Sequence, residues 1–65
     1  MIKVNGKVFE LERSVDIQSW LELQNVDTNK IAVELNGTLI KREDYSFEIL
    51  NDGDVMEVVA FVGGG

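Results

Sequence analysis

The chain has 65 residues and a formal net charge of −6 at neutral pH, from twelve acidic and six basic side chains. A chain of this length forms one domain with a thin core, with no room for the deep cavity that encloses most small-molecule substrates. Cysteine and histidine are absent, which excludes disulfides, thiolate or imidazole metal sites, and catalysis by either side chain.

The acidic balance also bears on partners and compartment. Net negative charge repels phosphate backbones, so we predict no nucleic-acid partner and favour a protein with a basic face. The alternative, of equal weight, is that the charge only keeps a small protein in solution. Small secreted domains usually carry disulfides, so we predict a cytoplasmic protein. Residues 1–6 read as a strand and not as a signal peptide, and no apolar run approaches membrane-spanning length.

The first twelve residues predict a β-hairpin. Ile2 and Val4 alternate with polar residues, and Phe9 and Leu11 alternate again within residues 7–12. Between these runs stands Asn5-Gly6. Asn-Gly at such a place is a strong signal for a tight turn, because both residues tolerate positive φ.

The apolar period then changes from two to about 3.6 residues, which predicts a short helix. The residues expected on its buried face are Ile17, Trp20, Leu21 and, as a further candidate, Gln24. Leu23 is expected to widen this apolar stripe. Asp16 is a candidate N-cap, since its carboxylate can accept a hydrogen bond from a free backbone N–H group of the first turn.

The second half of the chain predicts strands separated by turns. Residues 31–35 alternate as a third strand, and Asn36-Gly37 turns the chain into a short strand at residues 38–40. A charged turn at residues 41–44 leads into a loop in which Tyr45, Phe47 and Ile49 are spaced by two. Residues 51–54 give a third turn signal, and the β-branched run at residues 55–62 predicts the last strand.

This order of elements predicts an α+β fold with a mixed sheet of four to five strands and one helix packed on one face. We expect one domain over residues 1–62, followed by a flexible glycine tail at residues 63–65. Placing the last strand parallel to the first, as in ubiquitin-like β-grasp domains, is an inference at the level of the fold and not of the periodicity.

With these landmarks the sequence resembles the ThiS family of sulfur carriers in thiamin biosynthesis, part of the ThiS/MoaD group. The resemblance covers nearly the whole chain. It depends on the length, the strand opening at Met1-Ile2, the helix near Ile17, the turn at residues 52–54, and above all the final Gly64-Gly65.

The resemblance implies a protein co-substrate and not an enzyme. A ubiquitin-activating-type adenylyltransferase (ThiF-like) would adenylate the carboxylate of Gly65 with ATP. Sulfur from a cysteine desulfurase system would then convert it to a thiocarboxylate, from which thiazole synthase (ThiG-like) takes sulfur for the thiazole of thiamin. By the same resemblance the chain binds no cofactor or metal itself and is a monomer on its own.

The glycine tail suits this chemistry. The carboxylate of Gly65 is ionised at neutral pH, and glycine has no Cβ to crowd it or the walls of a partner's channel. Three extended residues reach on the order of 10 Å, so Gly63 and Gly64 are predicted to thread into the partner's site. Gly63 departs from a simple two-glycine ending and leaves the partner geometry open. The alternative is a frayed terminus without function.

The last strand also predicts a docking surface. Alternation places Met56 and Val58 toward the core and leaves Val59 and Phe61 on the other side, beside the tail, where exposed apolar residues often mark interfaces. Val62, at the end of the strand, is included in this predicted surface. The alternative is that a neighbouring strand of the domain covers Phe61.

The sequence also leaves alternative functions open. A sulfur carrier of another pathway, such as molybdopterin synthesis (MoaD-like), and a ubiquitin-like binding module with an inert tail are the main alternatives. An enzyme is disfavoured by the missing histidine, cysteine and cavity. Asp52 and Asp54 could indicate calcium, but an EF-hand loop with Gly53 at its sixth position requires glutamate where Val59 stands, and turn chemistry explains both aspartates.

Overall fold

A computed structural model of the chain describes residues 1–61. Three strands and a helix form the first part, followed by a short 3-10 helix and four further strands, with a second 3-10 helix among them. In chain order the elements are β1 (Ile2–Val4), β2 (Lys7–Phe9), β3 (Val15–Asp16), α1 (Ile17–Leu23), η1 (Thr28–Lys30), β4 (Ile31–Leu35), β5 (Thr38–Ile40), η2 (Arg42–Asp44), β6 (Ile49–Leu50) and β7 (Val55–Ala60).

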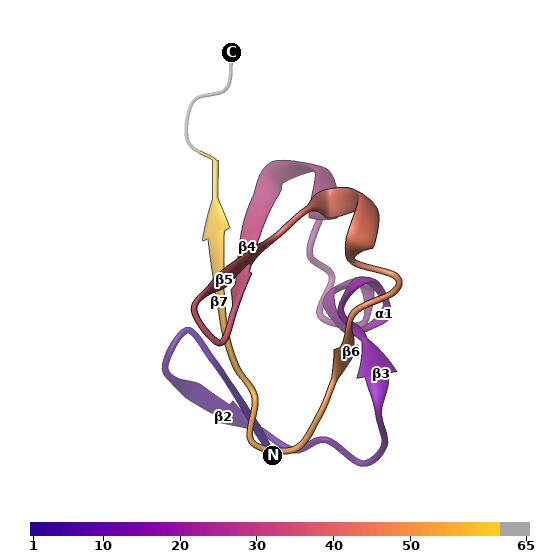
Figure 1. The fold of residues 1–65 in the computed structure, drawn as a ribbon, viewed down its shortest axis with the longest axis vertical. Coiled ribbons are helices and arrows are strands. Elements are labelled where there is room, and N and C mark those ends of the chain that lie inside the picture. Colours follow the sequence, from indigo (N-terminus) through magenta and orange to yellow (C-terminus); the bar gives the residue numbers. More distant parts are fainter. Residues whose placement is uncertain (62–65) are drawn as a thin grey trace.

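The main sheet has five strands in the order β2-β1-β7-β4-β5. β1 and β7 run parallel, and the other neighbours pair antiparallel. The predicted mixed sheet, and the contact between the first and last strands, are therefore confirmed. α1 and the small β3–β6 pair lie on one side of this sheet (Figure 1). We call the opposite side, which α1 does not cover, the outer face.

Both Asn-Gly pairs form the predicted tight turns. Asn5 and Gly6 have φ angles of 50° and 80°, and Asn36 and Gly37 have φ angles of 51° and 86°. Positive φ at both central positions is what a two-residue hairpin loop of type I′ requires. The short spacing that these turns impose places β1 beside β2 and β4 beside β5.

The core lies between the sheet and α1. Ile17, Trp20 and Leu21 are buried on the inner side of the helix, as the sequence predicts. The ring of Trp20 stands edge-on to that of Phe9, with centroids 5.2 Å apart, so the helix is packed against the first hairpin. The other buried apolar residues are Ile2, Val4, Ile31, Val33, Tyr45, Leu50 and Met56.

Asp16 is the N-cap of α1, as predicted. Its carboxylate accepts a hydrogen bond from the backbone N–H of Ser19 at 2.9 Å. Hydrogen bonding from Ser19 favours the ionised form and therefore lowers the pKa of Asp16. The cap fixes where the helix begins, directly after β3.

Three expectations about the first half are wrong. Leu23 does not widen the buried stripe, because 3.6 residues per turn place it outside the arc between Ile17 and Leu21, and it is 73% exposed. Gln24 is also exposed, as the C-cap of the helix. The second strand ends at Phe9 and not at residue 12, after which Leu11 packs against the edge of the core from a loop.

In the loop before the last strand, the residues spaced by two do not share one buried face. Tyr45 is buried, but Phe47 and Ile49 are exposed, because backbone bonds from Phe47 and Glu48 to the carbonyl of Asp44 close turns in this segment. After these turns the side chain of Ile49 faces solvent, and that of Leu50 lies in the core instead. Residues 49–50 then pair with residues 15–16, a contact that the sequence does not reveal.

Candidate functional site

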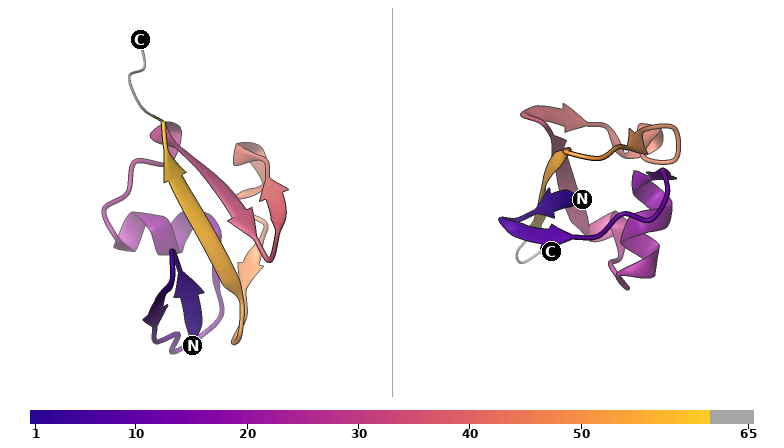
Figure 2. Two further views of the ribbon diagram at one scale, coloured as in Figure 1. Left: turned by 90° about the vertical axis from the view of Figure 1, so that its left-hand side faces the viewer. Right: turned by 90° about the horizontal axis from the view of Figure 1, so that it is seen from below.

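The candidate site is built on β7, the strand that leads to the glycine tail. β7 lies between β1 and β4 and is the long strand that runs diagonally across the sheet (Figure 2). β7 ends at Ala60, short of the run at residues 55–62 from which the strand was predicted. The backbone N–H of the next residue, Phe61, donates to the carbonyl of Lys30 at 2.9 Å. Val62 and the predicted functional glycines, Gly63, Gly64 and Gly65, lie outside the described residues. Their roles, and the division into a domain and a tail, stay predictions.

Alternation along β7 places its side chains as the sequence indicates. Met56 is fully buried, and Val58 is half-buried against the core. Val59 and Phe61 are 62% and 58% exposed, so no strand of the described part covers Phe61. Both side chains are thus available beside the start of the tail, while their role in docking stays a prediction.

Two asparagines fix β7 from opposite sides, a feature that sequence analysis missed. The side-chain amide of Asn5 donates to the carbonyl of Val58 at 3.0 Å, and its oxygen accepts from the Val58 N–H at 2.8 Å. The side-chain oxygen of Asn36 accepts from the Val55 N–H at 2.9 Å. Each asparagine therefore serves both as a turn residue and as a substitute for a strand neighbour of β7. Their position before glycine was the available signal, but it indicated only the turns.

The two side-chain hydrogen bonds between Asn5 and the backbone of Val58 predict a local effect on the strand that leads to the tail. In Asn5→Ala we expect the amide of Val58 to exchange faster with solvent, because its acceptor is gone, and global stability to fall by a further ~1–2 kcal/mol because alanine is strained at positive φ. Asn5→Gly relieves this strain but also loses the acceptor, whereas Asn5→Asp keeps the acceptor for the Val58 N–H and loses the donor to the Val58 carbonyl. Amide exchange measured by NMR should therefore show Val58 less protected in the alanine and glycine variants than in the aspartate variant. Equal protection in the glycine and aspartate variants would contradict a role of the Asn5 side chain as the acceptor of the Val58 N–H.

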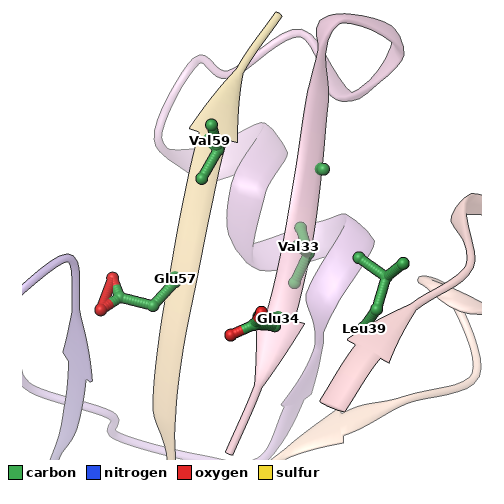
Figure 3. A pocket seen from close by; sticks show the side chains of 6 residues that line it. Val33, Glu34, Leu39, Glu57 and Val59 are labelled. Atoms are coloured by element: carbon green, nitrogen blue, oxygen red, sulfur yellow. The ribbon is translucent and has the colours of Figure 1, made fainter. Parts of the chain in front are cut away.

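The outer face carries acidic and apolar side chains together. Glu34 on β4 and Glu57 on β7 are directly opposite each other in the register, and Leu39 on β5 is the other neighbour of Glu34. Val59 lies two residues beyond Glu57 on β7, opposite Ala32. These residues line a shallow depression of about 320 Å³. Figure 3 shows the carboxylate of Glu34 turned toward β7 and that of Glu57 turned away from β4.

The aspartates of the turn before β7 are engaged in structure. The carboxylate of Asp54 accepts from the Asn36 side chain at 3.0 Å and from the Asn51 backbone at 2.8 Å. Asp52 pairs with the N-terminal ammonium group, and this hydrogen bond lowers its pKa. These contacts agree with the turn interpretation of both residues.

Residues 1–61 offer no group of three or more side chains with the arrangement of a metal site. Within the same residues, no helix is both long and apolar enough to cross a bilayer.

The comparison with known proteins fits this geometry. The family model described as the ThiS family matches residues 2–65, almost the whole chain. The chain belongs to the ThiS family. The fold is accordingly the ubiquitin-like β-grasp, as predicted, and the resemblance to ThiS is confirmed.

Individual ThiS relatives agree in length and fold. The sulfur carrier protein ThiS of Bacillus subtilis is 36% identical over 66 residues, and the match covers both chains completely. The crystal structure of the thiamine biosynthesis protein ThiS from Geobacter metallireducens is 33% identical, with a TM-score of 0.85 over 98% of this chain and 97% of that one.

Longer proteins also contain a similar segment. A thiazole synthase of Paramagnetospirillum magneticum is 37% identical over 62 residues, which are 95% of this chain and 19% of that protein. This chain therefore spans about a fifth of the length of that relative.

Proposed function

We propose that this chain is a sulfur carrier in the synthesis of the thiazole of thiamin, with the carboxylate of Gly65 as the group that carries sulfur. The observation that supports this most directly is the family match, which continues through residue 65 and so includes the terminal glycines. The match to the sulfur carrier of Bacillus subtilis, which covers both chains completely, supports it further. The chain acts as a protein co-substrate and not as a catalyst.

The proposed chemistry needs two steps at one carbon atom. An oxygen of the Gly65 carboxylate attacks the α-phosphorus of ATP and releases pyrophosphate, which turns a poor electrophile into an acyl-adenylate. A sulfide equivalent then attacks the carbonyl carbon, AMP leaves, and a thiocarboxylate remains. The chain contains no cysteine that could supply the sulfur. In this proposal a cysteine desulfurase system delivers the sulfur, and an adenylyltransferase uses the ATP.

Thiazole synthase is the proposed acceptor of the sulfur. Support comes from two thiazole synthases, of Paramagnetospirillum magneticum and Magnetococcus marinus, in which a segment similar to this chain makes up 19% and 20% of the protein. If the carrier and thiazole synthase act together, a carrier-like segment joined to the enzyme in one chain is expected. This observation favours the thiamin pathway over a MoaD-like role in molybdopterin synthesis.

The test is to incubate the protein with ATP, its cognate adenylyltransferase, a cysteine desulfurase, cysteine and a thiol reductant, and to measure the intact mass. We expect one oxygen to be replaced by sulfur, and fragmentation to locate the sulfur on Gly65. Omission of ATP should prevent the change. An unchanged mass with an active adenylyltransferase would instead support a binding module with an inert tail.

A further inference from the structure

The last residue that the structure describes, Phe61, is bonded to a short helix and not only to its own strand. Its N–H group donates to the carbonyl of Lys30, which is the final residue of η1. Gly65 lies only four residues further along the chain. The position of η1 therefore influences where the chain that leads to the Gly65 carboxylate leaves the sheet.

η1 is in turn bonded to an arginine from a distant part of the chain. The guanidinium group of Arg42 donates from Nε to the carbonyl of Thr28 and from Nη2 to the carbonyl of Asn29, each at 3.2 Å. Carbonyl groups at the end of a helix lack partners within the helix, so a basic side chain that donates to them stabilises that end. The rigid fork of a guanidinium group allows one side chain to donate to both.

Arg42 makes these bonds from a segment that is anchored to the core. It is the first residue of η2, and Tyr45, directly after that helix, is buried. The carbonyl of Tyr45 accepts from the N–H of Gln18 in the first turn of α1 at 3.1 Å. Neither ion pair recorded for residues 1–61 involves Arg42. Figure 1 shows residues 28–30 and 42–44 close together at the end of the sheet from which β7 leads to the tail.

We propose that Arg42 is a positioning residue for sulfur loading: it fixes η1, and η1 fixes Phe61, so that the tail leaves the domain at a defined place. The inference rests on the proposed function, which supplies the reaction. Arg42 acts through the carbonyl of Lys30 and not by contact with the reacting atoms. Without Arg42, the adenylyltransferase must order this segment when it binds the tail, which weakens binding and leaves the chemical step unchanged.

The first test measures exchange of the Phe61 amide hydrogen by NMR in the isolated protein. Arg42→Met removes both donors, whereas Arg42→Lys keeps the charge but replaces the fork by one flexible donor group. Lys41→Met is the control, since it removes the same charge from the exposed neighbour, whose side chain does not cap η2. We expect faster exchange in Arg42→Met, a smaller increase in Arg42→Lys and no change in Lys41→Met.

The second test measures the kinetics of adenylate formation by ATP–pyrophosphate exchange with the cognate adenylyltransferase. The entropy of fixing one more residue on binding corresponds to a loss of about fivefold in affinity. We therefore expect the KM for the carrier to rise about fivefold in Arg42→Met, with kcat unchanged, and to stay at the wild-type value in Lys41→Met. Thermal unfolding gives the folded fraction at the assay temperature, so that KM is calculated for folded protein.

The two measurements together decide the role of Arg42. Equal rises in KM for Arg42→Met and Lys41→Met would mean that the enzyme recognises the charge of this turn, and would overturn the inference. A raised KM without faster exchange at Phe61, or faster exchange with an unchanged KM, would overturn it as well. Should Arg42→Met fail to fold, Arg42→Lys provides the same comparison. If the wild type forms no adenylate, the proposed function fails, while the exchange rates still show whether Arg42 holds Phe61.

Discussion

Removal of all three terminal glycines is expected to abolish sulfur loading while the domain stays folded. The truncated chain ends at Val62, whose β-branched side chain crowds the terminal carbonyl carbon, and its carboxylate lies on the order of 10 Å short of its proposed position. Among residues 1–61, every buried core residue lies between Ile2 and Met56, so the cut removes none of these residues. Intact mass after the loading reaction measures the first effect, and thermal unfolding measures the second.

The control follows from the repetition of glycine. Deleting any one of Gly63, Gly64 and Gly65 gives the same protein, which still ends in Gly-Gly, so a single deletion tests tail length without changing the terminal chemistry. Full loading of this shorter chain would make the third glycine dispensable. Sulfur incorporation into the chain that ends at Val62 would contradict the assignment of the chemistry to the glycine tail.

Much of the fold follows from short-range signals in the sequence. The two Asn-Gly turns, the N-cap at Asp16 and the change of apolar period each depend on neighbouring residues, and the structure confirms all of them. The contact between residues 15–16 and 49–50 could not be predicted in this way, because two-residue strands carry no periodicity. Leu23 shows that an apolar residue next to a buried stripe need not belong to it.

The candidate site was predictable along one strand but not across strands. Alternation within β7 places Val59 and Phe61 on the exposed side. The opposition of Glu34 and Glu57 depends on the register between β4 and β7, which lie more than twenty residues apart in the chain, and the side-chain bonds from Asn5 and Asn36 depend on the same packing. Local sequence patterns therefore predict the strand and its exposed side, but the residues that lie beside it on other strands depend on the tertiary structure.

Trp20→Ala is expected to unfold most of the protein under conditions in which the wild type is folded. Removing a large aromatic side chain from a core costs about 3–5 kcal/mol, and a domain of this size has a total stability of roughly 3–10 kcal/mol. Trp20 is only 6% exposed, and its edge contact with Phe9 joins α1 to the first hairpin. Because the hairpin also supplies β1, the parallel neighbour of β7, loss of this contact reaches the strand that leads to the tail.

Leu23→Ala is the matched control in the same helix. Leu23 is 73% exposed, and alanine has a high helix propensity, so we expect its free energy of unfolding to stay within about 0.5 kcal/mol of the wild type. Urea unfolding followed by far-UV circular dichroism measures both variants without depending on the fluorescence of Trp20. A similar loss of stability in both variants would contradict the packing described, because it would place Leu23 in the core. A stable Trp20→Ala protein would mean that the remaining aliphatic residues alone hold the hairpin and the helix together.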